Sequence, residues 1–208
     1  GILMQIILNE DHLLLSDIEE YASKARAILV DDDNKIIVAN YNGALLLPGG
    51  SLDKNETPIE ALIRELKEET GCNYTESELE YFSCLSQFQK QFPKTNGTIK
   101  NRLIDNYYFI GKSKGLSLNN QKLTISEQKD NFKISLLTIE EIFALLNEKT
   151  LNPRSKFFNA ELNEILQLYK NTNDLSISEL TAFLNQIDSF ADDSEYRFRK
   201  GDIIALKI

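Results

Sequence analysis

The chain has 208 residues, of which 42% are hydrophobic and 26% are charged. This length and composition are typical of a folded globular protein with one domain, or with one domain and an appendage. The net charge of −9 argues against a broad nucleic-acid or anionic-membrane surface, because such surfaces need clustered positive charge.

Histidine and cysteine content restricts the kinds of site further. His12 is the single histidine, which argues against catalysis by a histidine base and excludes a multi-histidine zinc site. Cys72 and Cys84 are the two cysteines, and they fit a reduced cytoplasmic protein better than a disulfide-bonded one. The apolar stretch over residues 1–8 is too short to span a bilayer and lacks the basic flank of a signal peptide. We therefore expect a cytoplasmic protein without a membrane segment.

The first elements along the chain are two predicted strands, over residues 24–30 and 35–40. The acidic turn 31–34 joins them in a hairpin pattern. A short apolar run over residues 44–47 follows and leads to Gly49 and Gly50. Adjacent glycines permit backbone angles and close approaches that side chains forbid, so their carbonyl oxygens are available to a ligand.

The next element is a helix with clear boundaries. Thr57 and Pro58 provide a capping hydroxyl and a proline at the first helical position, and Glu60 stands three residues after the cap. Gly71 is a typical left-handed residue at a helix end. A core-facing stripe at helical spacing is formed by Ile59, Leu62, Ile63 and Leu66.

Three glutamates, Glu65, Glu68 and Glu69, crowd onto one side of this helix. Like charges at this spacing destabilise an isolated helix by roughly a few tenths of a kcal/mol per pair, unless a cation lies between them. A divalent cation such as Mg²⁺ is the natural compensation. The alternative is a solvated helix whose Arg64 pairs with Glu60 and Glu68.

Later elements follow the same alternation of strands and helices. Strands are predicted over 79–90 and 101–112, joined by an Asn-Gly turn within 93–98, and over 133–137. A capping box at Thr138 and Glu141 opens one helix, and another helix covers about 154–170. The tail is expected to contain a linker at 171–174, a helix from Ser176 to about Ser189 and a strand over 203–206.

The segment from Gly50 to Cys72 resembles the signature box of the Nudix hydrolase family, G-x5-E-x7-R-E-U-x-E-E-x-G-U with U apolar. Glu56, Arg64 and the three clustered glutamates occupy its defining positions. Cys72 stands where an aliphatic residue is usual, which is the one departure. The resemblance implies an α/β sandwich with a mixed β-sheet between helices, and the box as a loop-helix-loop at one edge.

We expect three parts in the chain: an N-terminal strand or lead-in over residues 1–23, a Nudix domain over 24–170, and an extension over 171–208. The extension is a short helix and strand that packs on its own domain, assists a homodimer or closes over the substrate. The segment from Met4 to Leu15 is a candidate to pair with this extension.

The resemblance also implies a chemistry. The family hydrolyses a nucleoside diphosphate linked to another moiety, and it uses Mg²⁺, with Mn²⁺ as a substitute. The matching metal ligands are Glu65, Glu68 and Glu69 with the carbonyl oxygen of Gly49 or Gly50. Glu56 is placed to hold Arg64, in a supporting or a purely structural role. Glu68, Glu69 and Arg64 are the expected catalytic residues within the box.

Residues outside the box are less defined. Glu127, in the polar connection 116–130, is a candidate general base, although an exposed glutamate without a role is the competing interpretation. Arg26 and Arg102 are candidate phosphate contacts, and the competing interpretation is that both are ordinary surface charges.

The partner expected from these residues is a small nucleotide. Open substrates include a nucleotide sugar, ADP-ribose, a dinucleotide and an oxidised nucleoside triphosphate. Two alternatives to a small-molecule hydrolase remain: a Nudix-fold regulator that binds a nucleotide without cleaving it, and an RNA-decapping enzyme. The net negative charge of the chain disfavours the RNA-decapping enzyme.

Overall fold

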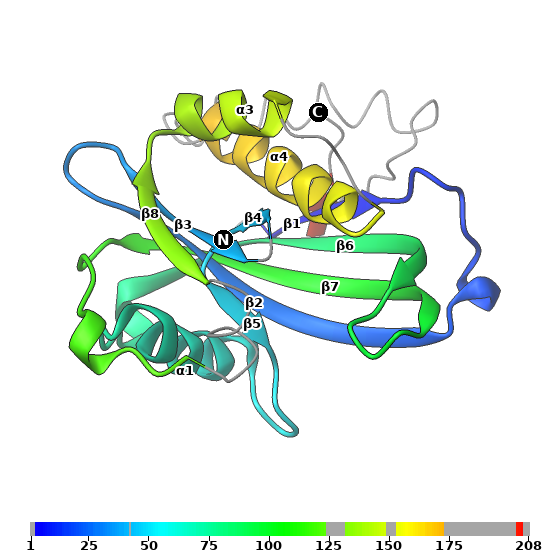
Figure 1. Cartoon of the computed structure of the whole chain (residues 1–208), viewed down its shortest axis with the longest axis horizontal. Coiled ribbons are helices and arrows are strands. Elements are labelled where there is room, and N and C mark those ends of the chain that lie inside the picture. Colours follow the sequence, from blue (N-terminus) through cyan, green and yellow to red (C-terminus); the bar gives the residue numbers. More distant parts are fainter. Residues whose placement is uncertain (1–2, 42, 124–131, 149–152, 173–202, 206–208) are drawn as a thin grey trace. The chain divides into compact units, whose positions relative to one another are not determined.

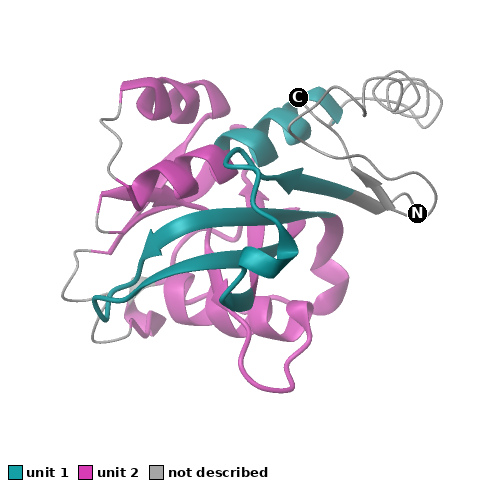
Figure 2. Cartoon of the chain, turned by 90° about the vertical axis from the view of Figure 1, so that its right-hand side faces the viewer, with its two compact units in different colours: residues 1–22, 83–106, 163–208 teal, residues 23–82, 107–162 magenta. Residues whose placement is uncertain are grey.

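A computed structural model of the chain describes residues 3–41, 43–123, 132–148, 153–172 and 203–205 (Figure 1). The strands belong to one mixed sheet, and the chain divides into two compact units (Figure 2). The larger unit comprises residues 23–82 and 107–162, and the smaller unit comprises residues 1–22, 83–106 and 163–208. The three predicted parts 1–23, 24–170 and 171–208 stay a prediction.

The larger unit contains the predicted hairpin and the strands around it. Val30 of β2 pairs with Ile36 of β3 in antiparallel register, and β3 pairs with both β4 and β8. The diglycine segment is itself a short strand, β5, paired with β2. The bounds are β2 Glu20–Val30, β3 Ile36–Tyr41, β4 Ala44–Leu46, β5 Gly49–Ser51, β7 Ile99–Lys112 and β8 Lys133–Leu137.

The core of this unit lies between β2 and the box helix, α1 (Pro58–Thr70). Alternate β2 residues point to the same face, and the small side chains of Ala25 and Ala27 allow the helix to approach closely. Leu62 and Leu66 of α1 are fully buried there. Each such leucine contributes about 1.5–3 kcal/mol by leaving water. The predicted apolar stripe is therefore confirmed as core.

The opposite face of β2 is covered by the start of α4 (Ser155–Thr172). Lys24 lies with its Nζ 5.5 Å from the centre of the Phe158 ring, and Arg26 meets Glu161. Helices on both faces of a mixed sheet confirm the predicted fold class. Thr138 also caps the start of α3 (Ile139–Glu148) as predicted, because the Glu141 N–H donates to Thr138 Oγ1.

The smaller unit is built on a hairpin of β6 (Leu79–Pro93) with β7, whose predicted Asn-Gly turn places Gly97 at φ +86°. On the far side of β6 lies β1 (Leu3–Leu8), which is parallel to it. β1 also pairs with β9 (Ile203–Ala205), which confirms the expected pairing of the N-terminal segment with the tail strand.

The linker prediction at 171–174 is wrong in its first half. α4 continues to Thr172, whose hydroxyl donates to the Leu168 carbonyl at 2.7 Å and so remains on the helix. The second half of this linker and the helix predicted from Ser176 lie outside the described residues. No helix in the described part of the chain is long and apolar enough to cross a membrane.

Candidate functional site

The loop-helix-loop that carries the box glutamates has the predicted boundaries. Thr57 Oγ1 accepts a hydrogen bond from the Glu60 N–H at 3.3 Å, and Pro58 is the first helical residue. At the other end Gly71 adopts φ +74°, and its N–H donates to the Lys67 carbonyl. These contacts satisfy backbone groups that a helix leaves open at its two ends.

The two glycines of β5 bring the chain close to two box acids. Gly49 has φ +137°, and a Cβ there would overlap the carbonyl oxygen of Ala25. Its N–H donates to Glu69 Oε2 at 2.8 Å, so the largely buried Glu69 carboxylate rests on the backbone. A Cβ on Gly50 would lie 2.6 Å from Glu65 Oε1. A side chain at Gly49 would therefore overlap the backbone of β2, and a side chain at Gly50 would displace the Glu65 carboxylate, so glycine suits both positions.

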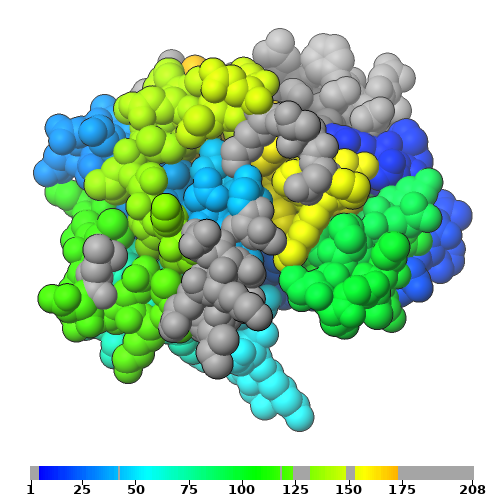
Figure 3. Space-filling view, viewed as in Figure 1, coloured from blue at the N-terminus to red at the C-terminus, as the bar shows by residue number. Residues whose placement is uncertain are grey.

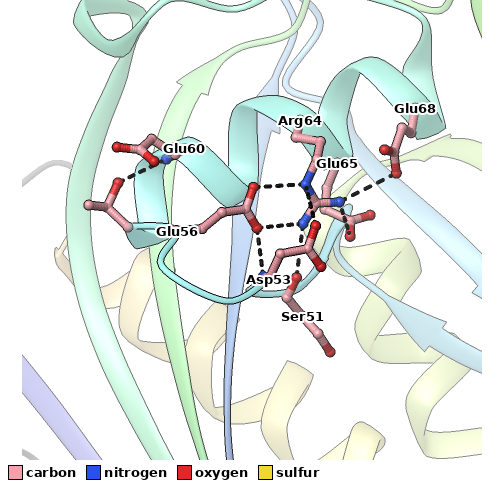
Figure 4. A network of polar contacts seen from close by, with 8 residues as sticks. Ser51, Asp53, Glu56, Glu60, Arg64, Glu65 and Glu68 are labelled. Atoms are coloured by element: carbon pink, nitrogen blue, oxygen red, sulfur yellow. Dashed lines mark hydrogen bonds and ion pairs between the residues drawn. The ribbon is translucent and has the colours of Figure 1, made fainter.

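Arg64 is the centre of the polar network around these acids (Figure 4). Its Nε and Nη2 donate to the two oxygens of Glu56, each at 2.8 Å. Its Nη1 lies 3.0 Å from Glu65 Oε1 and 3.6 Å from Glu68 Oε2. The predicted pairing of Glu56 with Arg64 is thus present as a two-bond contact, the stronger geometry for an arginine and a carboxylate.

Charge in this network shifts the proton affinity of both partners. The hydrogen bonds from Arg64 lower the pKa of Glu56 from 4.5 to about 2. The same bonds raise the pKa of Arg64 above its already high ordinary value. Both groups are therefore fully charged at neutral pH, as an arginine fixed between acids requires.

The loop between β5 and α1 projects from the surface of the larger unit (Figure 3). Lys54 and Asn55 at its tip are exposed, and Asn55 is in the left-handed region at φ +67°. Glu56 turns back toward the helix, where its Oε1 accepts the Asp53 N–H at 2.6 Å. The turn of this loop is what aims Glu56 at Arg64.

The box acids present the oxygen donors that Mg²⁺ and Mn²⁺ prefer. Among the described residues, no three His, Cys, Asp or Glu side chains lie close enough together to hold one metal ion. Glu65 and Glu68 lie against Arg64, and Glu69 lies on the Gly49 N–H. The donor set fits a divalent ion, as does the space that only glycine leaves for the Glu65 carboxylate. Convergence on one ion requires Glu65 and Glu68 to rotate from Arg64 toward Glu69, which keeps its contact with Gly49.

Residues 117–122, which have no recognisable sequence signature, cap the C-terminal end of α1. The Ser117 and Lys122 N–H groups donate to the Thr70 and Glu68 carbonyls at 2.7 and 2.6 Å. The Gln121 side chain donates to the Glu69 carbonyl at 2.8 Å. These partners are backbone oxygens, which leave no signature in a sequence.

The remaining predicted site residues have mixed outcomes. Glu127 lies outside the described residues, so its role as a base stays a prediction. The interpretation of Arg26 and Arg102 as surface charges is wrong, because their side chains are buried. Arg102 stacks on the Phe92 ring at 3.7 Å and donates twice to Gln89 Oε1. Contact of either arginine with phosphate stays a prediction.

Comparison with known proteins finds short stretches of similarity to curated relatives. The chain is 38% identical over 61 residues to an 8-oxo-dGTP diphosphatase of Proteus vulgaris, covering 26% of this chain and 54% of that protein. It is 42% identical over 48 residues to an ADP-ribose pyrophosphatase of Methanocaldococcus jannaschii, covering 21% of this chain and 28% of that protein. The chain thus spans about half the length of the first relative and less of the second.

Among solved structures, the solution structure of the E. coli ORF135 protein matches with a TM-score of 0.48 and 19% identity, covering 78% of this chain and 100% of that one. The family model described as NUDIX domain matches residues 20–160, more than half of the chain. The chain therefore belongs to the NUDIX domain family.

Proposed function

We propose that this protein is a hydrolase that uses a divalent metal ion to cleave the pyrophosphate linkage of a nucleoside diphosphate joined to another moiety. The observation that carries the proposal is the set of three box glutamates on one helix, Glu65, Glu68 and Glu69, with Gly50 lying directly against the Glu65 carboxylate. Family membership supports the same reaction class.

In this proposal Glu65, Glu68 and Glu69 hold the metal together with the Gly49 carbonyl. When bound, Mg²⁺ or Mn²⁺ neutralises charge on the diphosphate and makes water a better nucleophile. Arg64 and Glu56 keep the helix surface and its acids in place. The base is a box glutamate or Glu127.

The substrate is proposed at the level of a class. The two curated relatives described above are named for an oxidised nucleoside triphosphate and for ADP-ribose. In both compounds a phosphoanhydride bond joins phosphates that are attached to a nucleoside. A nucleotide sugar and a dinucleotide share that bond and remain within the proposal.

A panel of these compounds with Mg²⁺, assayed for released nucleoside monophosphate, tests the proposal. Glu68→Gln is expected to lower turnover by orders of magnitude with an unchanged circular dichroism spectrum, because it removes a proposed metal ligand. Glu60→Gln is the matched control, since it removes an exposed carboxylate from the first turn of the same helix. Equal turnover in wild type and Glu68→Gln would refute the assignment.

One observation favours a second candidate, a regulator that binds a nucleotide without cleaving it. Within the described part of the chain the box acids do not converge in a group that could hold an ion. For such a regulator, calorimetry would detect a nucleotide that binds while no member of the panel is cleaved.

A further inference from the structure

Arg26 is a buried cation on the face of β2 that lies opposite the box helix. Its side chain is 6% exposed, and its Nε lies 3.8 Å from Glu161 Oε1 without a hydrogen-bond acceptor among the described residues. Its neighbours Ala25 and Ala27 face the core under α1. Burying a charge in this way is costly, so its position calls for an explanation.

The explanation lies in what the guanidinium holds. Nη1 of Arg26 donates to the carbonyl of Leu47 at 2.8 Å. Leu47 precedes Pro48 and the two glycines of β5. The backbone of β2 fixes the same stretch along its edge, because the Ala27 N–H donates to the Pro48 carbonyl at 3.0 Å and Arg26 pairs with Gly49. The stretch is therefore held by a strand ladder and by one side chain.

Glu161 fixes Arg26 from the other side. Tyr108 donates a hydrogen bond to Glu161, and both side chains are buried. Apolar side chains of β4 and α4, including Leu45 and Phe158, surround the pair. A guanidinium in these surroundings has few alternative orientations, which suits it to hold a carbonyl in one place.

The diglycine strand in turn contacts a box glutamate. Gly49, two residues after Leu47, donates its N–H to Glu69 at 2.8 Å. We propose that Arg26 is a positioning residue: by holding the Leu47 carbonyl, it fixes the diglycine strand and, through Gly49, the orientation of Glu69 that metal binding requires. The part of this inference that concerns metal binding rests on the proposed function. The part that concerns the order of the diglycine strand does not.

A double variant separates positioning from general stability. Arg26→Met with Glu161→Gln removes both buried charges together and keeps an acceptor for Tyr108, so no uncompensated charge remains. In metal-free protein we expect amide hydrogen exchange over residues 44–51 to become about 10-fold faster or more, with α1 unchanged. Mn²⁺ affinity, measured by electron paramagnetic resonance without substrate, should fall about 10- to 100-fold.

Two further variants serve as controls for the double variant. Arg102→Met removes another buried arginine, which stacks on Phe92 and donates to Gln89, and it should leave both the exchange over 44–51 and Mn²⁺ uptake unchanged. Arg26→Lys retains a cationic donor and should restore part of the loss. If the double variant does not fold by circular dichroism, Arg26→Lys alone is compared with wild type, and wild-type exchange and affinity in it would overturn the inference.

The outcomes are distinguishable. No Mn²⁺ uptake by wild type would count against the proposed function, and hydrogen exchange would still test the hold on the diglycine strand. Normal wild-type uptake with unchanged exchange and affinity in the double variant would overturn the inference. Faster exchange with unchanged Mn²⁺ affinity would overturn the link from Arg26 to Glu69.

Discussion

Replacing Glu56 by glutamine removes the charge that Arg64 meets with two nitrogens. In the native protein the pKa of Glu56 is lowered to about 2, mainly by hydrogen bonds from Arg64. In the unfolded chain it returns to about 4.5. A carboxyl whose pKa is lowered by folding stabilises the native state fully above the unfolded pKa, and this contribution is lost as the pH falls through the folded one. The relevant window therefore runs from about pH 4.5 down to about pH 2.

The magnitude follows from the two pKa values. A difference from 4.5 to about 2 corresponds to an upper limit of about 3.4 kcal/mol, at about 1.36 kcal/mol for each pH unit. The Glu56 side chain is 18% exposed, so solvent screens part of this interaction. We expect Glu56→Gln to lower the free energy of unfolding by about 2 kcal/mol at pH 6, and by much less near pH 2.

Urea denaturation of wild type and Glu56→Gln at pH 6, 4 and 3, followed by circular dichroism, measures this difference. Asp53→Asn is the matched control, because Asp53 lies 3.4 Å from the same Arg64 Nε but is 69% exposed. Exposed pairs contribute about 0–1 kcal/mol, so this control should show a small effect with little pH dependence. A stability difference between wild type and Glu56→Gln that is equal at pH 6 and pH 3 would refute the reasoning.

Two further predictions concern the glycines and the cysteines. Gly50→Ala should leave the melting temperature nearly unchanged but lower turnover, because the three heavy atoms nearest to its Cβ all belong to the flexible Glu65 carboxylate. Gly49→Ala should instead destabilise the fold in thermal denaturation, since the new Cβ meets backbone atoms at a positive φ; equal melting temperatures for the two variants would contradict this distinction. Burial raises the pKa of Cys84 to about 12, so in a Cys72→Ser background the native protein should react very slowly with a thiol reagent at pH 8. Rapid native-state labelling, monitored by mass spectrometry and equal to that in urea, would show the thiol to be accessible.

The parts of the fold that the sequence predicted well are those specified by neighbouring residues. Thr57 and Gly71 mark the ends of α1 because caps act on backbone groups within one turn. The turn at Gly97 and the hairpin of β2 and β3 are likewise local. The resemblance of the box implied the pairing of Glu56 with Arg64, from which it is separated only by a short loop and the first turns of α1.

The parts that it missed depend on distant segments. An arginine in a predicted strand is usually a surface charge, but residues 25–29 of β2 are all buried, and the contacts of Arg26 with Glu161 and the Leu47 carbonyl come from distant segments. Residues 117–122 cap the box helix by donating hydrogen bonds to its backbone carbonyl oxygens, so no side-chain pattern in the sequence predicts this contact. The strand formed by Gly49 and Gly50 was not predicted either, because its pairing with β2 depends on Gly49 having no Cβ beside the Ala25 carbonyl oxygen.

The pairing of β1 between β6 and β9 has a practical consequence for shortened versions of this protein. The family match begins at residue 20, which makes a chain starting there an obvious choice for expression. Such a chain would lack the strand that pairs with β6 on one side and β9 on the other. The exposed edge of β6 would present unpaired backbone N–H and C=O groups to other molecules, which is a common route to aggregation. Poor solubility of that version would then reflect a missing neighbour rather than a damaged Nudix box.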